Sequence, residues 1–322
     1  MKHLLFISFF CLIILPVSSL KAQEFYSSLN SYNNILLNPS YAGFKYKSNV
    51  WSSYSVFAKS KDEIFNEFTL VYDRYSPKLK GGTAIFFKQG LQADVNINTL
   101  EFGFSFAPRI KRFKGIFFPS GYIGYTKPVK QWFAYGFDEW RNSFENYQNT
   151  PGKAFLRSDV YKLGGSMLFI VENIQFGISG YYGFQLKNDE KVESSRAPYK
   201  ILAHFSTRAN RKSNGVLSRS KEISPQFILH YENGLFQSKS ELRVTGKKFL
   251  YSVFLLNNFS DNIHNLGGSA GIENDGIRLV LSAGFGSTVK LDKLTLNSSI
   301  SLILKLPKEN IKRLFPFKPL DD

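Results

Sequence analysis

Hydrophobic and polar residues alternate along almost the whole chain after residue 46. The clearest case is residues 294–305, where leucine or isoleucine fills most alternate positions and threonine, asparagine or serine lies between them. The same alternation runs through residues 100–106, 174–184 and 277–286. Because successive side chains of a strand point to opposite faces of a sheet, these segments are predicted to be strands with one apolar and one polar face.

The number of such segments predicts the fold class. An even number of membrane-length strands is typical of single-chain bacterial outer-membrane barrels. The polar face is rich in glycine, serine, glutamine and charged residues, which suits a lumen better than the solvent-facing side of a soluble sandwich. The sequence therefore predicts an all-β fold: one transmembrane antiparallel β-barrel of about 14 strands over residues 46–306. The predicted strands are 46–58, 63–75, 81–89, 95–107, 116–126, 159–171, 173–185, 198–208, 222–231, 235–244, 247–257, 264–273, 275–286 and 294–305.

The lengths of the connections predict which end of the barrel faces outward. If the N-terminus is periplasmic, the connections that follow even-numbered strands must be periplasmic and short. The tight turns at 172–173, 245–246 and 274–276 agree with this rule. The longest connection, 127–158, follows an odd-numbered strand and is predicted to be extracellular. Two features agree poorly: residues 209–221 make a long connection on the periplasmic side, and Asn233-Gly234 makes a tight turn on the outer side.

The first 22 residues have the parts of a secretory signal peptide. A polar start precedes a mostly apolar run that ends at Pro16, and small residues follow. The run is too short to span a membrane, so cleavage is predicted after Ala22. The single cysteine, Cys11, would leave with the signal peptide, so the mature chain would have no disulfide and no cysteine nucleophile. Residues 307–322 form a tail, basic and then acidic, beyond the last predicted strand.

The composition agrees with a membrane barrel. Of the whole chain, 43% is hydrophobic and 16% aromatic, yet no stretch of 18 consecutive apolar residues follows the signal peptide. A barrel needs an apolar outer wall and aromatic girdles, and it hides both in alternate positions. The predicted location is the outer membrane.

The net charge of +16 leaves two interpretations open. A basic exported protein has little access to nucleic acid, so its partner would be an anionic lipid surface or an acidic protein. Alternatively, lysine and arginine only decorate loops and strand ends.

Motifs for catalysis or cofactor binding are weak. The histidines of the mature chain, His204, His230 and His264, are scattered singly without metal-binding spacing. The G-x-S-x-G match at 267–271 lies inside a predicted strand with no helix after it, whereas a nucleophile elbow needs a strand-to-helix turn. Glycines spaced by three at 177–183 also lie inside a strand, so they do not form a phosphate loop. We therefore expect no enzyme activity, no catalytic or metal residue and no cofactor.

The long connection at 127–158 carries a cluster of aromatic residues. Exposed aromatic side chains on a loop favour a partner-binding surface. An aromatic interface belt at the rim of the barrel would have the same composition. Both interpretations stay open for Trp132, Phe133, Tyr135, Phe137 and Trp140.

The segment at 23–43 carries a family resemblance. It opens with Gln23-Glu24-Phe25 and ends with Asn38-Pro39-Ser40-Tyr41-Ala42-Gly43. This stretch resembles the opening of the PorP/SprF family of type IX secretion outer-membrane proteins. The resemblance implies a Bacteroidota outer-membrane protein that works with type IX secretion components and takes part in adhesin export and gliding motility. Its expected partner is a secreted, adhesin-like protein. The alternative is a porin-like channel for small or apolar solutes.

The same segment can be interpreted from its residues alone. A residue before proline disfavours helix, so Asn38-Pro39 predicts a turn, and Gly43 permits a tight backbone before the first strand. Residues 23–45 are therefore predicted to form a short capping or plug segment in the periplasmic mouth. The roles expected for its motif residues are structural: Asn38, Pro39, Tyr41, Ala42 and Gly43.

Overall fold

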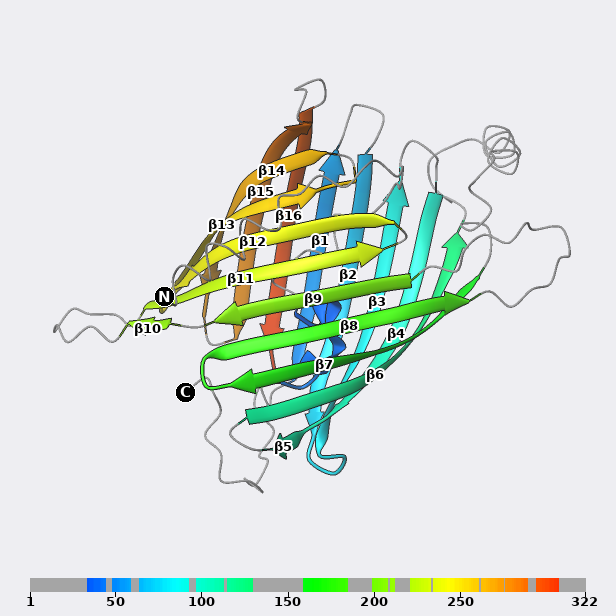
Figure 1. Cartoon of the computed structure of the whole chain (residues 1–322), viewed down its shortest axis with the longest axis vertical. Helices are drawn as coiled ribbons and strands as arrows, with labels where there is room; N and C mark the ends of the chain where they lie inside the picture. Colours follow the sequence, from blue (N-terminus) through cyan, green and yellow to red (C-terminus); the bar gives the residue numbers. More distant parts are fainter. Residues whose placement is uncertain are drawn as a thin grey trace, which may run out of the picture.

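The chain forms a closed antiparallel β-barrel in a computed structural model (Figure 1). The structure describes residues 34–44, 48–58, 64–92, 97–112, 115–129, 159–184, 199–207, 209–211, 221–232, 234–260, 262–274, 276–288 and 294–306. The predicted signal peptide and its cleavage after Ala22, the aromatic loop and the tail lie outside the described residues.

Fourteen long strands make up the wall, as predicted. Neighbours along the chain pair with each other, and the barrel closes where β1 (Asn49–Ala58) pairs with β16 (Leu294–Lys305). The short strands β5 (Ile110–Arg112) and β10 (Ala209–Arg211), which were not predicted, extend the pairing of β6 and β11. The other strands are β2 Ile64–Ser76, β3 Gly81–Gln92, β4 Ile97–Pro108, β6 Gly115–Val129, β7 Val160–Val171, β8 Ile174–Phe184, β9 Tyr199–Thr207, β11 Lys221–Glu232, β12 Leu235–Thr245, β13 Phe249–Asn258, β14 Ile263–Glu273 and β15 Ile277–Thr288.

The connections distinguish the two ends of the barrel. Tight turns join β2 to β3, β7 to β8, β12 to β13 and β14 to β15 at the same end. Short turns face the periplasm in outer-membrane barrels, so we call this the periplasmic end and the opposite one the outer end. The chain enters β1 from the periplasmic end.

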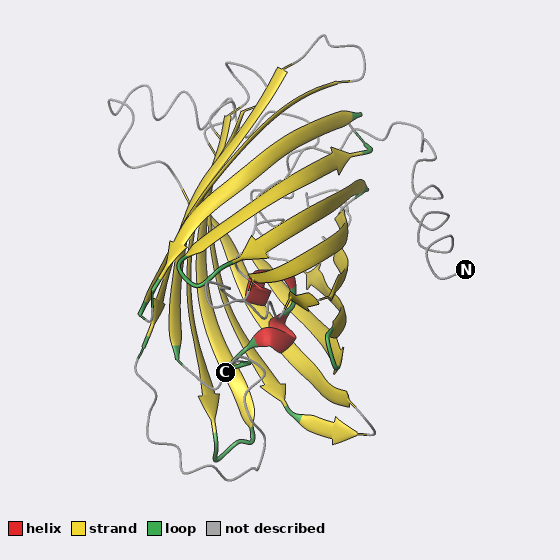
Figure 2. Cartoon of the chain, turned by 90° about the vertical axis from the view of Figure 1, so that its left-hand side faces the viewer, coloured by secondary structure: helices red, strands yellow, loops and turns green. Residues whose placement is uncertain are grey.

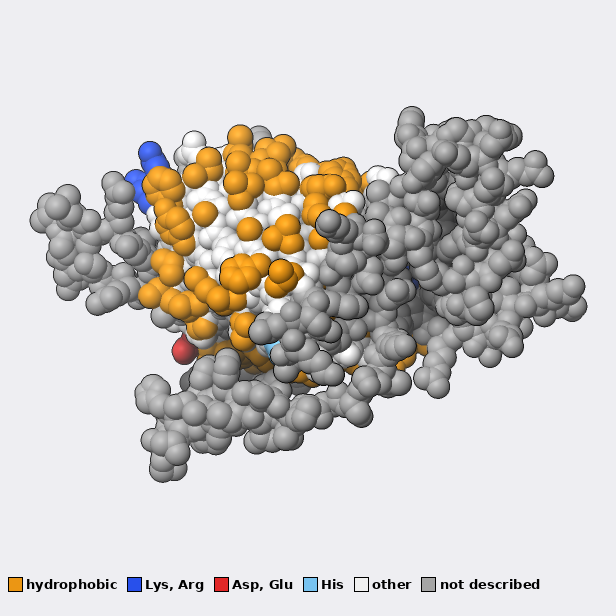
Figure 3. Space-filling model, turned by 90° about the horizontal axis from the view of Figure 1, so that it is seen from above, with side chains coloured by type: hydrophobic (Ala, Val, Ile, Leu, Met, Phe, Trp, Pro, Cys, Tyr) orange, Lys and Arg blue, Asp and Glu red, His pale blue; other side chains and the backbone are white. Residues whose placement is uncertain are grey.

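The predicted alternation of side chains is confirmed on every strand used to derive it. In β16, Leu294 and Leu296 are exposed on the outer wall, while Thr295 and Ser301 are buried in the lumen. Seen from above, hydrophobic side chains are spread in patches over the visible part of the described wall, and few charged ones are seen there (Figure 3).

Two rows of aromatic residues cross the outer wall in direct register. On β6, β7 and β8 the rows are eight residues apart. At about 3.3 Å per residue and about 40° of tilt this is roughly 20 Å, close to the height of the apolar band of an outer-membrane barrel. The chain therefore has the architecture of an outer-membrane β-barrel. The periplasmic row is Phe117, Phe169, Phe176, Phe205 and Phe227, and the outer row is Phe87, Phe102, Tyr125, Tyr161 and Phe184.

A short segment that precedes β1 lies inside the barrel (Figure 2). It contains the helix α2 (Asn34–Leu37) and the 3-10 helix η2 (Pro39–Tyr41), and we call residues 34–44 the plug. Neither helix is long and apolar enough to cross a membrane, and no other helix is found among the described residues.

Candidate functional site

The plug owes its compact turn to its own sequence. Asn38 is extended (φ −150°, ψ 110°), as the residue before a proline prefers. Its side chain accepts a hydrogen bond from the backbone N–H of Ser40 at 2.9 Å, which caps the 3-10 helix, and Pro39 occupies the first helical position. The prediction of a turn at Asn38-Pro39 is confirmed.

One side of the plug forms a hydrophobic core with the barrel wall. Ile35, Tyr41 and Ala42 pack there, and all three are buried. A lumen filled with water would expose the inward-facing apolar side chains of the wall, so the plug is the element that shields them. The wall side of this core is formed by Val71, Ala84, Phe86, Ala107, Phe118, Tyr122, Leu168 and Ile170.

The other side of the plug contacts a second set of strands. Leu37 is 1% exposed and packs with Leu202 of β9, Ile228 of β11 and Leu256 of β13. The plug thus bridges two parts of the wall across the lumen.

Glycines in the wall make room for the plug. A Cβ at Gly82 would lie 1.7 Å from the carbonyl oxygen of Ala42. A Cβ at Gly177 would lie 2.5 Å from Asn38 Nδ2 and 2.1 Å from a ring carbon of His204. Gly43 has φ +59°, a conformation that non-glycine residues rarely adopt. Gly177 therefore lies inside a strand as predicted, and it serves close packing.

Hydrogen bonds fix the plug in register with β7 and β8. Asn38 Nδ2 donates to the carbonyl oxygen of Met167 at 3.0 Å, in the middle of β7. The hydroxyls of Ser40 and Ser166 lie 2.7 Å apart, and that of Ser120 lies 2.5 Å from Ser166. The plug therefore extends from the periplasmic ends of the strands to the middle of β7.

Tyr41 extends these contacts to β8 and β9. Its hydroxyl donates to Gln175 Oε1 at 3.0 Å and lies 3.1 Å from His204 Nε2. His204 is 2% exposed. His204 therefore faces the lumen, and its hydrogen-bond partner is a plug residue.

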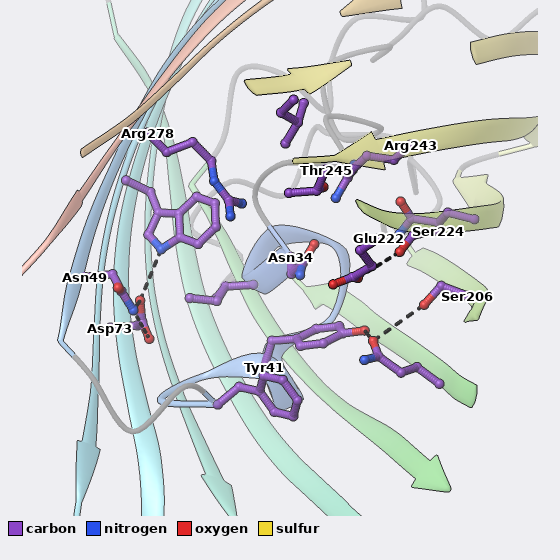
Figure 4. A pocket seen from close by; sticks show the side chains of 16 residues that line it. Asn34, Tyr41, Asn49, Asp73, Ser206, Glu222, Ser224, Arg243, Thr245 and Arg278 are labelled. Atoms are coloured by element: carbon purple, nitrogen blue, oxygen red, sulfur yellow. Dashed lines mark hydrogen bonds between the residues drawn. The ribbon is translucent and has the colours of Figure 1, made fainter. Parts of the chain in front are cut away.

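Two oppositely charged residues hold the end of the plug. Asp73 accepts hydrogen bonds from the N–H of Gly43 and from the side chains of Asn49 and Trp51, each at 3.1 Å (Figure 4). On the other side, Arg109 donates to the carbonyl oxygens of Gly43 and Phe44. Asp73 and Arg109 thus bind the N–H and the carbonyl oxygen of Gly43, and we call these two residues the clasp.

Arg109 has the same inward-facing parity as Ser105 and Ala107 of β4, and it lies where the pairing of the wall is interrupted. The pairing of β4 with β6 ends at Phe106 and resumes between Ile110 of β5 and β6. Pro108 and Pro119 lie within this gap, where neither has an N–H to donate to a ladder, and the register on its two sides is the same. The guanidinium of Arg109 lies over the Tyr75 and Phe118 rings, 4.5 and 5.3 Å from their centroids.

A layer of ion pairs crosses the lumen nearer the outer end. Lys162 Nζ lies 2.8 Å from Glu101, which also accepts from the Tyr122 hydroxyl at 2.9 Å. Glu232 accepts from the Tyr181 hydroxyl at 2.6 Å and lies 3.1 Å from His230 Nε2. Largely buried charges need such partners to offset their desolvation. The charged layer consists of Glu67, Lys88, Glu101, Lys162, Lys200 and Glu232, and the buried ring of His230 contacts Glu232.

The sequence did not predict this layer as a unit. It indicated only that charged residues alternate into the lumen, because most of the pairs join different strands and depend on the register between them. Separately, no group of three histidine, cysteine or acidic residues that could hold a metal ion occurs among the described residues.

Beside the plug, part of the lumen remains open as a cavity of about 140 Å³. Arg243 and Arg278 enter it from β12 and β15, and Asn34 of the plug faces them (Figure 4). Most lining residues of the wall belong to the periplasmic ends of their strands. The cavity therefore belongs to the periplasmic half of the barrel.

The structure brings together one of the two predicted sets of site residues. Asn38, Pro39, Tyr41, Ala42 and Gly43 all belong to the plug. The loop set, from Trp132 to Trp140, lies outside the described residues. The G-x-S-x-G match lies within β14, and a tight turn to β15 follows it, as predicted.

Comparison with known proteins gives a likeness in fold only. No family model and no curated protein matches this chain. Among similar solved structures, the CymD monoaromatic hydrocarbon channel has 8% identity and a TM-score of 0.48, covering 86% of this chain and 93% of that one. The Pseudomonas putida toluene transporter TodX has 9% identity and a TM-score of 0.42 (89% and 99%). The Acinetobacter baumannii outer-membrane protein Omp33 has 9% identity and a TM-score of 0.44 (82% and 100%). At this distance, none of them indicates what this chain transports or binds.

Proposed function

We propose that this chain is an accessory outer-membrane barrel of type IX secretion that helps to export or surface-anchor a partner protein such as a large adhesin. It acts as a binding and handling protein without enzyme activity. The resemblance of residues 23–43 to the PorP/SprF opening supports the type IX role. The observation that carries the accessory role is the plug with its hydrophobic core inside the barrel.

A filled lumen favours an accessory role over free diffusion. A diffusion porin needs a continuous, polar and hydrated path through its barrel. Here the plug occupies the lumen, with β2, β3, β4, β6 and β7 on one side and β9, β11 and β13 on the other. The charged layer crosses the lumen nearer the outer end. A barrel that works through its rims and loops needs a rigid wall, and a packed plug makes the wall rigid.

The second candidate function is a channel for small solutes. The cavity beside the plug favours it, because some of the lumen stays open there. Its charged and polar lining suits a polar solute better than an apolar one.

Deletion of the gene tests the proposal. Surface proteins that carry a type IX sorting domain should fall several-fold when intact cells are surface-labelled, and the wild-type gene should restore them. Complementation with Gly121→Ala is the matched control, since a Cβ at this outer-wall position meets nothing within 4 Å. Unchanged surface proteins in the deletion strain, together with steady conductance of the purified protein, would establish the channel instead.

The aromatic loop is proposed to hold the partner. Trp and Tyr clusters supply a large contact area for few ordered torsions. Deleting residues 130–150 should leave an inserted barrel, because loop tips tolerate deletion, and should lower the amount of partner retained at the surface. If retention is unchanged, Trp132 and Trp140 are interfacial anchors.

A further inference from the structure

We infer that the cavity beside the plug binds one ring of a neutral sugar. The cavity is lined by the plug and by the periplasmic halves of several strands, at about 140 Å³. A roughly 150 Å³ cavity holds a benzene molecule in an engineered protein, so this volume takes the six ring atoms of one sugar, and its hydroxyl groups must reach the lining side chains and the adjoining lumen. This inference is independent of the proposed function.

The charges of the lining point to a ligand without net charge. Two arginines, Arg243 and Arg278, line the cavity with two carboxylates, Asp73 and Glu222, so the formal charges cancel. Arg278 is bound by Glu273 at 2.6 Å, and Arg243 by Glu241 at 3.3 Å. A free anion or a zwitterion would have to compete with these pairs, whereas a hydroxyl group can add a hydrogen bond to a charge that is already paired.

The uncharged lining supplies hydrogen-bonding groups for hydroxyls. Asn34, Gln226 and Thr245 line the cavity, and their side chains make no hydrogen bond to any other described residue. An amide both donates and accepts, and so does a hydroxyl, so these groups match the hydroxyls of a sugar in either direction. Water would satisfy them when no sugar is bound.

Aromatic side chains line the cavity and can contact the apolar face of a sugar ring. Trp51 of β1 lines the cavity together with Tyr41 and Phe44 of the plug (Figure 4). A pyranose ring has an apolar C–H face that packs on an aromatic ring, while its hydroxyls point outward. Planar polar groups around aromatic rings therefore select a sugar over a hydrocarbon of equal size.

Trp51 provides a direct signal of binding. The chain has three tryptophans, so a Trp132→Phe/Trp140→Phe protein in detergent reports on Trp51 alone. Titration with D-glucose, D-galactose, D-mannose and N-acetylglucosamine should give a saturable fluorescence change for at least one sugar, with half-saturation at about 1–10 mM. Glycine and sodium acetate at the same concentrations should give none.

A matched pair of variants separates the cavity from the rest of the surface. In the same background, Gln226→Leu should raise the half-saturating sugar concentration about fivefold, because one hydrogen bond contributes about 1 kcal/mol. Gln89→Leu, on the outer wall of β3, should leave it unchanged. The inference is overturned if no sugar gives a saturable response up to about 100 mM, if glycine gives the same response, or if both variants respond equally.

Discussion

Gly82 of the barrel wall lies directly against Ala42 of the plug. A Cβ at position 82 would come within 1.7 Å of the carbonyl oxygen of Ala42, so the wall and the plug fit only without a side chain there. This contact joins two segments 40 residues apart and fixes how deeply the plug sits.

Gly82→Ala should therefore loosen the plug. The backbone of Ala42 cannot yield as a flexible side chain would, so we expect the free energy of unfolding to fall by about 2–3 kcal/mol. Urea titration of protein folded into lipid vesicles measures this change. Gly121→Ala is the control and should be neutral, because its Cβ points to open space. Equal stability of the two variants would refute the tight contact.

Asp73→Ala should destabilise the plug and β1 together. It removes the acceptor of three hydrogen bonds, two of them to β1 and one to Gly43. We expect the free energy of unfolding to fall by about 3 kcal/mol. Ser40 is fully buried in the intact plug, so a cysteine introduced there by Ser40→Cys should react with a maleimide only when Asp73→Ala has loosened the plug. Asp159→Ala, at an exposed aspartate, should change stability by less than about 1 kcal/mol and leave Ser40→Cys protected. Protection of Ser40→Cys in the Asp73→Ala protein would mean that the clasp does not hold the plug.

Glu232→Gln tests the charged layer. Glu232 has partners in Tyr181, His230 and Lys200, so removing its charge leaves Lys200 without its counter-charge at 3.9 Å. Breaking such a pair should lower the free energy of unfolding by about 3 kcal/mol, and a Glu232→Gln/Lys200→Met protein should regain part of this stability. Glu172→Gln, in an exposed turn, is the control and should have little effect. If Glu232→Gln is as stable as this control, the layer is hydrated and contributes no net stability.

The sequence predicted the features that depend on neighbouring residues, and it missed the contacts between residues far apart in the chain. Strands such as β8 and β16 were predicted within one or two residues, because alternation is a local property of the chain. The turn at Asn38-Pro39 was predicted for the same reason. The sequence could not show that Asp73 and Arg109 meet at Gly43, since the register of the closed barrel brings these residues together.

The central claim is that the plug stays in the lumen while the protein works. A Ser40→Cys/Ser166→Cys protein tests it most directly, because the two hydroxyls lie 2.7 Å apart and the cysteines should form a disulfide between plug and wall. The measurement is single-channel recording of this protein in a planar bilayer, before and after the disulfide is reduced. We predict no steady conductance in either state. Conductance steps that appear on reduction and vanish on reoxidation would contradict the account, because they would show that the plug opens a channel.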